Sequence, residues 1–115
     1  MSVGQKKIRA RFYRLDSGKQ PVQEWLLELD REDRRAIGKD IQKVEFGWPI
    51  GMPFSRKLEA NMHEVRSNIS NGRIARVLFC IKNSEMILLH GFIKKTQSTA
   101  DKEKQIARQR MKGSK

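Results

Sequence analysis

Two arginines interrupt otherwise apolar segments of this 115-residue sequence, and they are its first candidates for chemistry. Arg66 lies within residues 63–69, where apolar and polar side chains alternate, and Arg76 lies within the apolar run 74–81. The Asn71-Gly72 pair between the two segments is a strong signal for a β-hairpin turn. We therefore predict that the two segments are paired strands and that the two guanidinium groups are near neighbours across the ladder.

Like charges directly opposite each other on paired strands are destabilising, so these arginines need a compensating group. An anion bound between them would compensate their charge, and so would a carboxylate such as Glu64 or Glu85. The planar guanidinium fork binds two phosphate oxygens at once, so a phosphate is a suitable anion. The alternative is that both arginines lie at a sheet edge and extend into solvent.

Further basic residues lie at the end of the next apolar run. Strand alternation places His90 and Lys94 on one face and Lys95 on the other. Gly91 indicates a close backbone approach or a bulge, and a lone strand histidine such as His90 is more often structural than catalytic. The dipeptide Arg56-Lys57 precedes the predicted strand over 63–69 and provides two more basic side chains from a predicted loop.

The charge of the whole chain favours a polyanionic partner. The sequence has 25 Lys and Arg against 13 Asp and Glu, a formal net charge of +12 and a pI near 10.4. Residues 1–55 carry 11 basic and 8 acidic groups, whereas residues 56–115 carry 14 basic and 5 acidic groups. Nucleic acid is therefore the leading partner class, and the alternatives are improved solubility or an acidic protein partner.

The composition excludes several other kinds of site. With a single cysteine, Cys80, and two histidines, the sequence has too few ligands for a cysteine or histidine metal site. It has no glycine-rich phosphate loop, no Ser–His–Asp order and no carboxylate cluster that would hold magnesium. It also lacks an apolar run long enough to span a membrane and a signal peptide, so we expect a cytoplasmic protein. Chemistry on RNA would therefore be metal-independent, with the 2′-OH attacking the adjacent phosphate and basic side chains stabilising the phosphorane.

Periodicity and turn signals predict the elements that must position these residues. We predict one α+β domain over residues 1–115, with element order β-α-α-β-β-β-α. A helical hairpin packs on one face of an antiparallel meander sheet and leaves the other face for the C-terminal helix or a ligand. The first predicted elements are a strand over 7–15, a helix that begins at Pro21, and a second helix that has Asp30 as its N-cap and runs to about residue 46. A loop over 47–53 follows. The remaining elements are strands over 63–69, 74–81 and 86–93 and a helix over 101–111.

Three stretches of the sequence resemble a known family. These are Glu64-Val65-Arg66, the run from Arg73 to Phe79, and the run Leu88-Leu89-His90-Gly91-Phe92-Ile93-Lys94-Lys95-Thr96-Gln97. They are similar to motifs of the phage-derived HigB-like branch of the RelE/ParE toxin superfamily, and the predicted RelE-like element order agrees. His63 and Ala75 depart from the usual pattern, which has bulkier apolar or aromatic residues at these positions.

The resemblance implies a type II toxin that cleaves messenger RNA on the ribosome without metal or cofactor. A helix-turn-helix antitoxin would hold it inactive, and no membrane contact is expected. The alternatives are a ParE-like toxin that inhibits gyrase without cutting RNA, and a basic RNA-binding protein with neither activity. The positions that match the family's functional basic residues are Arg66, Arg76, Lys94, Lys57 and Lys95. We expect Arg66, Arg76 and Lys94 to be catalytic, with Lys94 or Lys57 as base or electrostatic stabiliser, and His90 is an alternative group for proton transfer. The residues expected to contact RNA are Lys57, Arg73, His90 and Lys95.

Overall fold

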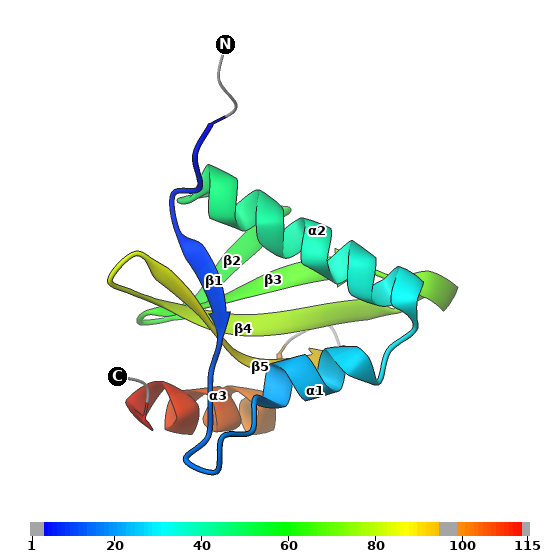
Figure 1. Ribbon diagram of the computed structural model, residues 1–115. Coiled ribbons are helices and arrows are strands. Elements are labelled where there is room, and N and C mark those ends of the chain that lie inside the picture. Colours follow the sequence, from blue (N-terminus) through cyan, green and yellow to red (C-terminus); the bar gives the residue numbers. More distant parts are fainter. Residues whose placement is uncertain (1–3, 95–98, 114–115) are drawn as a thin grey trace.

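The computed structural model describes residues 4–94 and 99–113, and within them the chain forms a five-stranded sheet and three α-helices. Figure 1 shows the three helices packed around the sheet. The elements are β1 (Arg9–Phe12), α1 (Pro21–Leu27), α2 (Arg31–Gly47), β2 (Ser55–Glu59), β3 (Met62–Asn68), a 3₁₀ turn η1 (Ser70–Gly72), β4 (Ile74–Lys82), β5 (Glu85–Ile93) and α3 (Asp101–Gly113). The predicted α+β class is confirmed.

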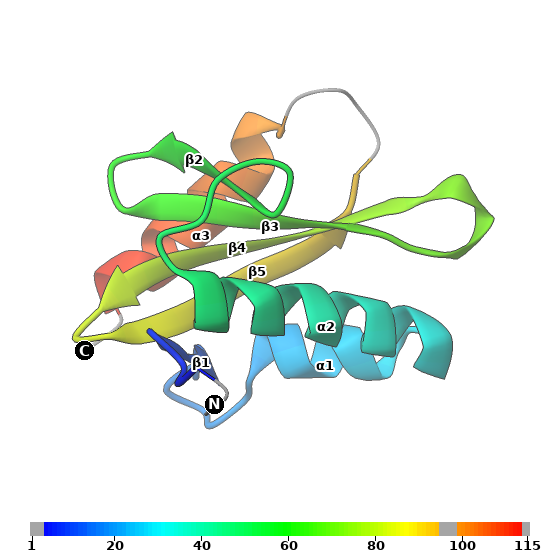
Figure 2. The same ribbon diagram turned by 90° about the horizontal axis from the view of Figure 1, so that it is seen from above.

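The strands lie in the order β1-β5-β4-β3-β2. Strands β2 to β5 form an antiparallel meander, of which the part from β3 to β5 was predicted, and β3, β4 and β5 are inner strands. Helices α1 and α2 cover one face of the sheet and α3 covers the other (Figure 2). We call these the α2 face and the α3 face.

Two parts of the predicted topology are wrong. Residues 55–59 form strand β2 and not a loop, and β1 pairs in parallel with β5, so the sheet is mixed. The sequence pattern did not predict β2, because Leu58 is the one apolar residue of this edge strand. The strand therefore shows no alternation of apolar and polar residues. The direction of β1 depends on how the chain returns through α1 and α2, which local patterns do not encode.

Local signals predict the starts of α1 and α2 correctly. Pro21 occupies the first turn of α1, where a missing N–H breaks no hydrogen bond, and Asp30 is the N-cap residue of α2. The helices bury Val22, Ile37 and Val44 against the sheet. Among the described helices, none is both long and apolar enough to cross a membrane.

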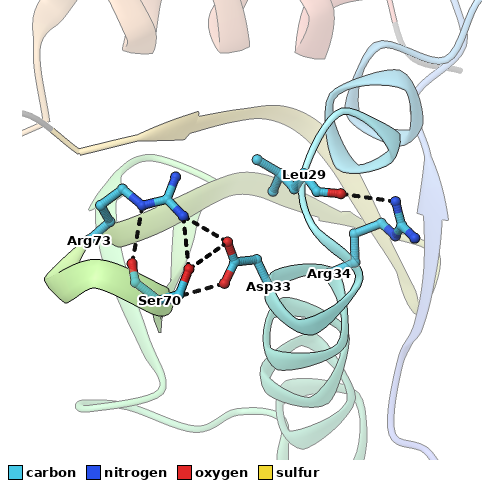
Figure 3. A network of polar contacts seen from close by, with 5 residues as sticks. All are labelled: Leu29, Asp33, Arg34, Ser70 and Arg73. Atoms are coloured by element: carbon cyan, nitrogen blue, oxygen red, sulfur yellow. Dashed lines mark hydrogen bonds and ion pairs between the residues drawn. The ribbon is translucent and has the colours of Figure 1, made fainter.

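A short connection joins α1 to α2, and Arg34 stabilises it. The Arg34 Nη1 donates hydrogen bonds to the carbonyl oxygens of Leu29, at 2.9 Å, and Leu27, at 3.3 Å. Carbonyls at the end of a helix lack partners within the helix, so this guanidinium satisfies two of them; Figure 3 shows the bond to Leu29. These bonds connect α2 to the end of α1 and to the residues that follow it, and both helices cover the α2 face.

Gly91 provides the close approach that its position in a strand predicts. The ring of Trp25 from α1 lies over this residue, and a Cβ atom on Gly91 would be 2.4 Å from Trp25 Cε3. The adjacent β4–β5 register also shifts, since Leu78 pairs with His90 while Phe79 pairs with Leu88. Glycine is therefore required for α1 to pack directly on β5.

Candidate functional site

Arg66 and Arg76 face each other directly across the β3–β4 ladder, as the hairpin signal predicted. They differ in exposure, because Arg66 is exposed while the Arg76 side chain has a relative accessibility of 1%. The alternative in which both arginines extend from a sheet edge into solvent is therefore wrong for Arg76. Both side chains belong to the α3 face, since Val65, Ala75 and Val77, their neighbours in the chain, belong to the core on the α2 side.

The expected carboxylate partner is Glu64, while Glu85 pairs with Arg11. Nη1 of Arg76 lies 2.9 Å and 3.1 Å from the two oxygens of Glu64, whose side chain is also buried. Nη2 of Arg56 lies 3.1 Å from Glu64 Oε1. A buried arginine and a buried carboxylate thus neutralise each other, as burial of charge requires.

Thr99 closes this group from the segment that leads into α3. Its hydroxyl donates to Glu64 Oε2 at 2.8 Å and accepts a hydrogen bond from Arg76 Nη1 at 2.7 Å. Glu64, Arg76, Arg56 and Thr99 form what we call the Glu64 network. It connects β2, β3 and β4 to the segment before α3, and all of its members come from different elements of the chain.

Positive charge exceeds negative charge around the Glu64 network. Partial loss of hydration, followed by the charges of Arg76 and Arg66, lowers the pKa of Lys94 below its usual value, and Glu64 opposes this. Burial also lowers the pKa of Arg76, and again Glu64 opposes the change. We call Arg56, Arg66, Arg76 and Lys94 the basic cluster. Four cations around one carboxylate give a site that can accept an anion, and an amine that gives up its proton more readily than an ordinary lysine.

Lys57 does not belong to this cluster. Arg56 pairs in register with Glu64, whereas Lys57 pairs with His63, so the two basic side chains lie on opposite faces of β2. The sequence analysis named both residues as basic groups in a loop but selected only Lys57 as an RNA contact. Once β2 is known to be a strand, alternation alone distinguishes the two residues.

Arg73 lies on the α2 face, in an ion pair with Asp33 of α2. Its Nη2 is 2.8 Å from Asp33 Oδ2, and the amide and hydroxyl of Ser70 each donate to Asp33 at 3.0 Å (Figure 3). These contacts lower the pKa of Asp33, the backbone hydrogen bond from Ser70 having the largest effect. We call these three residues the Asp33 group; it attaches α2 to the β3–β4 connection.

His90 attaches α3 to the sheet. Its Nε2 is 2.8 Å from Glu103 Oε1, and its ring stacks on Phe92 with centroids 5.5 Å apart. Burial lowers the pKa of His90, although the hydrogen bond to Glu103 opposes this. Arg108 of α3 adds a two-pronged ion pair to Glu59 of β2, at 2.6 and 2.8 Å. These contacts match the structural role expected of a strand histidine. Lys95, the remaining predicted RNA contact, is outside the described residues.

Residues 24–112 match the family model described as "Phage derived protein Gp49-like (DUF891)". The chain belongs to this Gp49-like family. The matched region runs from α1 to α3 and includes the Glu64 network and the basic cluster. The Gp49-like family is in general one of RelE/HigB-like toxins. No curated protein matches the sequence.

Within residues 4–94 and 99–113, no group of three or more His, Cys, Asp or Glu side chains is arranged to hold a metal ion. The candidate chemical groups at this site are cations. Arg66 offers an exposed guanidinium, and Lys94 offers an amine with a lowered pKa. The Glu64 network connects strands β3 and β4 beneath them.

Proposed function

We propose that this Gp49-like protein is a type II toxin of the HigB kind, a metal-independent endoribonuclease that cleaves messenger RNA on the ribosome. A helix-turn-helix antitoxin is proposed to hold it inactive. The observation that supports the proposal is the basic cluster, in which Arg56, Arg66, Arg76 and Lys94 surround one carboxylate. Such a surplus of cations suits a phosphate whose charge increases during reaction.

In the proposed reaction, Arg66 holds the non-bridging oxygens of the scissile phosphate. Lys94 accepts the proton of the adjacent 2′-OH, which a lowered pKa favours because more of the amine is then neutral. The 2′-oxygen bonds to phosphorus, the bond to the 5′-oxygen breaks, and that oxygen takes a proton from solvent. The products are a 2′,3′-cyclic phosphate and a 5′-OH, so no external nucleophile or metal is needed.

Arg76 contributes to the proposed site mainly from beneath its surface. Its side chain is buried and contacts Glu64 and Thr99, so it supplies positive charge and holds the carboxylate in place. Substitution by alanine would leave a buried carboxylate short of one partner, which is strongly destabilising. Exposed Arg66 is therefore the better position for a test that must leave the fold intact.

The test is mapping of transcript 5′-ends after brief induction of the protein in cells, with chelator present during extraction. We expect new 5′-ends within translated regions for the wild type and none for Arg66→Ala. Arg73→Ala is the control, because it removes the same charge from the opposite face of the sheet while Asp33 keeps its two hydrogen bonds from Ser70. Its circular dichroism spectrum must match that of the wild type. Growth arrest with intact transcripts and gyrase-linked DNA breaks would replace the proposal by a ParE-like activity. If induction causes neither transcript cuts nor growth arrest, the remaining alternative is a basic RNA-binding protein without toxin activity.

A further inference from the structure

A second basic site lies on the α2 face of strand β2, opposite the Glu64 network. It is a pocket of about 320 Å³, close to the lower end of the range for small-molecule sites. Lys57 and His63 contribute to it from β2 and β3, and the chain that follows α2 contributes Trp48 and Ile50. The other residues that line the pocket are Pro49, Gly51 and Ser55.

The lining of this pocket is aromatic, with one cation, Lys57. The rings of Trp48 and His63 meet edge to face with centroids 5.0 Å apart, and His63 stacks on Phe79 at 5.3 Å. Burial, followed by the charge of Lys57, lowers the pKa of His63, so its ring is neutral at pH 7 and carries one donor and one acceptor. The exposed ammonium of Lys57 is at the rim. Aromatic and aliphatic walls with a hydrogen-bonding edge suit a planar heterocycle, and the adjacent cation suits a phosphate.

The position of the pocket relates it to the basic cluster. Arg56 and Lys57 are consecutive residues of an edge strand, so their Cα atoms are about 3.8 Å apart while their side chains lie on opposite faces. Arg56 belongs to the basic cluster and Lys57 to the pocket. A single strand of RNA that passes around the free edge of β2 can therefore contact both sites.

We propose that this pocket binds a nucleobase of the same RNA strand, next to the nucleotide whose phosphate lies at the basic cluster. The base packs against Trp48 and hydrogen-bonds to His63, and Lys57 contacts the phosphate attached to it. The inference rests on the proposed function for its choice of RNA, and it adds a subsite that would position the strand for cleavage. Single-stranded RNA exposes its bases for contacts of this kind, whereas duplex RNA does not.

The test uses the full-length protein and a seven-nucleotide single-stranded RNA with 2′-O-methyl groups throughout, which cannot be cleaved by its own 2′-oxygens. We expect saturable quenching of tryptophan fluorescence that disappears in Trp48→Phe, where Trp25 remains the emitter. Trp48→Ala should weaken binding about fivefold or more, the usual effect of losing one stacked base. Lys57→Glu should weaken binding more than the matched control Lys19→Glu, whose exposed side chain precedes α1 near the other edge of the sheet.

The outcomes separate this inference from the proposed function. No saturable quenching up to about 100 µM RNA, or equal effects of Lys57→Glu and Lys19→Glu, would overturn the pocket as a base site. The base site would also be overturned if Trp48→Ala and Lys57→Glu cut transcripts in cells as the wild type does. The proposed nuclease activity would not be contradicted by that result. If RNA quenches the fluorescence of Trp48 but the protein cuts no transcript, the pocket is supported as a base site and the proposed nuclease activity is contradicted. Each variant must retain the circular dichroism spectrum of the wild type.

Discussion

The two faces of the sheet carry polar groups of the same composition that have different surroundings. On the α2 face, Arg73 pairs with the buried Asp33 and both contact the hydroxyl of Ser70. On the α3 face, Arg76 pairs with the buried Glu64 and both contact the hydroxyl of Thr99. Each group is an arginine, a carboxylate and a hydroxyl, and each connects a helix or the chain leading into it to strands of the sheet.

The difference lies in the balance of charge. Asp33 and Arg73 carry one charge each, and they attach α2 to the β3–β4 connection. Glu64 pairs with two arginines, and Arg66 and Lys94 lie close enough to influence the ionisation of the group. A balanced group can hold a structure together, whereas a group with surplus positive charge can also bind an anion. The same local chemistry therefore favours a structural role on one face and a functional role on the other.

The largest effect is expected from removing one arginine on each face. In a cleavage assay on translating ribosomes, Arg66→Ala should lower the rate by 10²–10³-fold, about the value of one charge that stabilises a transition state. Arg73→Ala should change the rate less than about threefold, since Arg73 lies on the face opposite the basic cluster, in contact with Asp33 of α2. Equal losses in the two variants would remove the functional distinction between the faces.

The next effect concerns the burial of Glu64. Glu64→Gln leaves Arg56 and Arg76 without their anionic partner, and we expect the free energy of unfolding to fall by about 3 kcal/mol. Glu59→Gln is the matched control, because Glu59 pairs with the partly exposed Arg108 and should cost less than about 1 kcal/mol. Urea denaturation measures both. Equal costs would show that Arg76 needs no carboxylate.

A smaller loss of stability is expected from packing on the α2 face. Gly91→Ala places a methyl group against Trp25 and should cost about 2 kcal/mol, because the ring must move. Trp25→Leu in the same chain should recover part of this loss in a double-mutant cycle. Affinity for the uncleavable RNA should stay unchanged, which would confirm that this contact serves only the fold. An additive cycle would contradict the predicted clash.

The pH dependence of cleavage should show the charge surplus on the α3 face. If Lys94 is the base, the rate rises with pH and then levels off. The pH at which the rate is half its maximum should lie below the usual lysine pKa of about 10.4. Arg66→Gln removes one of the charges that lower this pKa, so the midpoint should move up in addition to any loss of rate. A midpoint that is the same in both proteins would exclude Lys94 as the titrating group.

The smallest effect is expected from acid titration of the Asp33 group. The pKa of Asp33 is lowered in the folded protein, so its contribution to stability is complete above the unfolded value of 3.8 and is lost as the pH falls through the folded value. Asp33→Asn should therefore unfold with a weaker pH dependence below about pH 4. Thermal melts of both proteins between pH 2 and pH 6 measure this. Identical curves would show that Asp33 does not contribute through its charge.

Several features of this protein were determined by sequence alone, because they depend on residues close together in the chain. Pro21 and Asp30 set the starts of two helices, and the Asn71-Gly72 turn sets the β3–β4 hairpin. The facing pair Arg66 and Arg76 followed from that turn, since a hairpin fixes the register of the strands that it joins. The close approach at Gly91 was also predicted, although its partner was not.

Tertiary structure alone decided how the candidate site is assembled. Thr99 contacts Glu64 across 35 residues, and Arg56 joins the same carboxylate only because β2 pairs with β3. The parallel pairing of β1 with β5 likewise depends on a return through two helices. Contacts of this kind leave no periodic signal in the sequence, because they depend on how complete elements pack and not on the spacing of residues within one element.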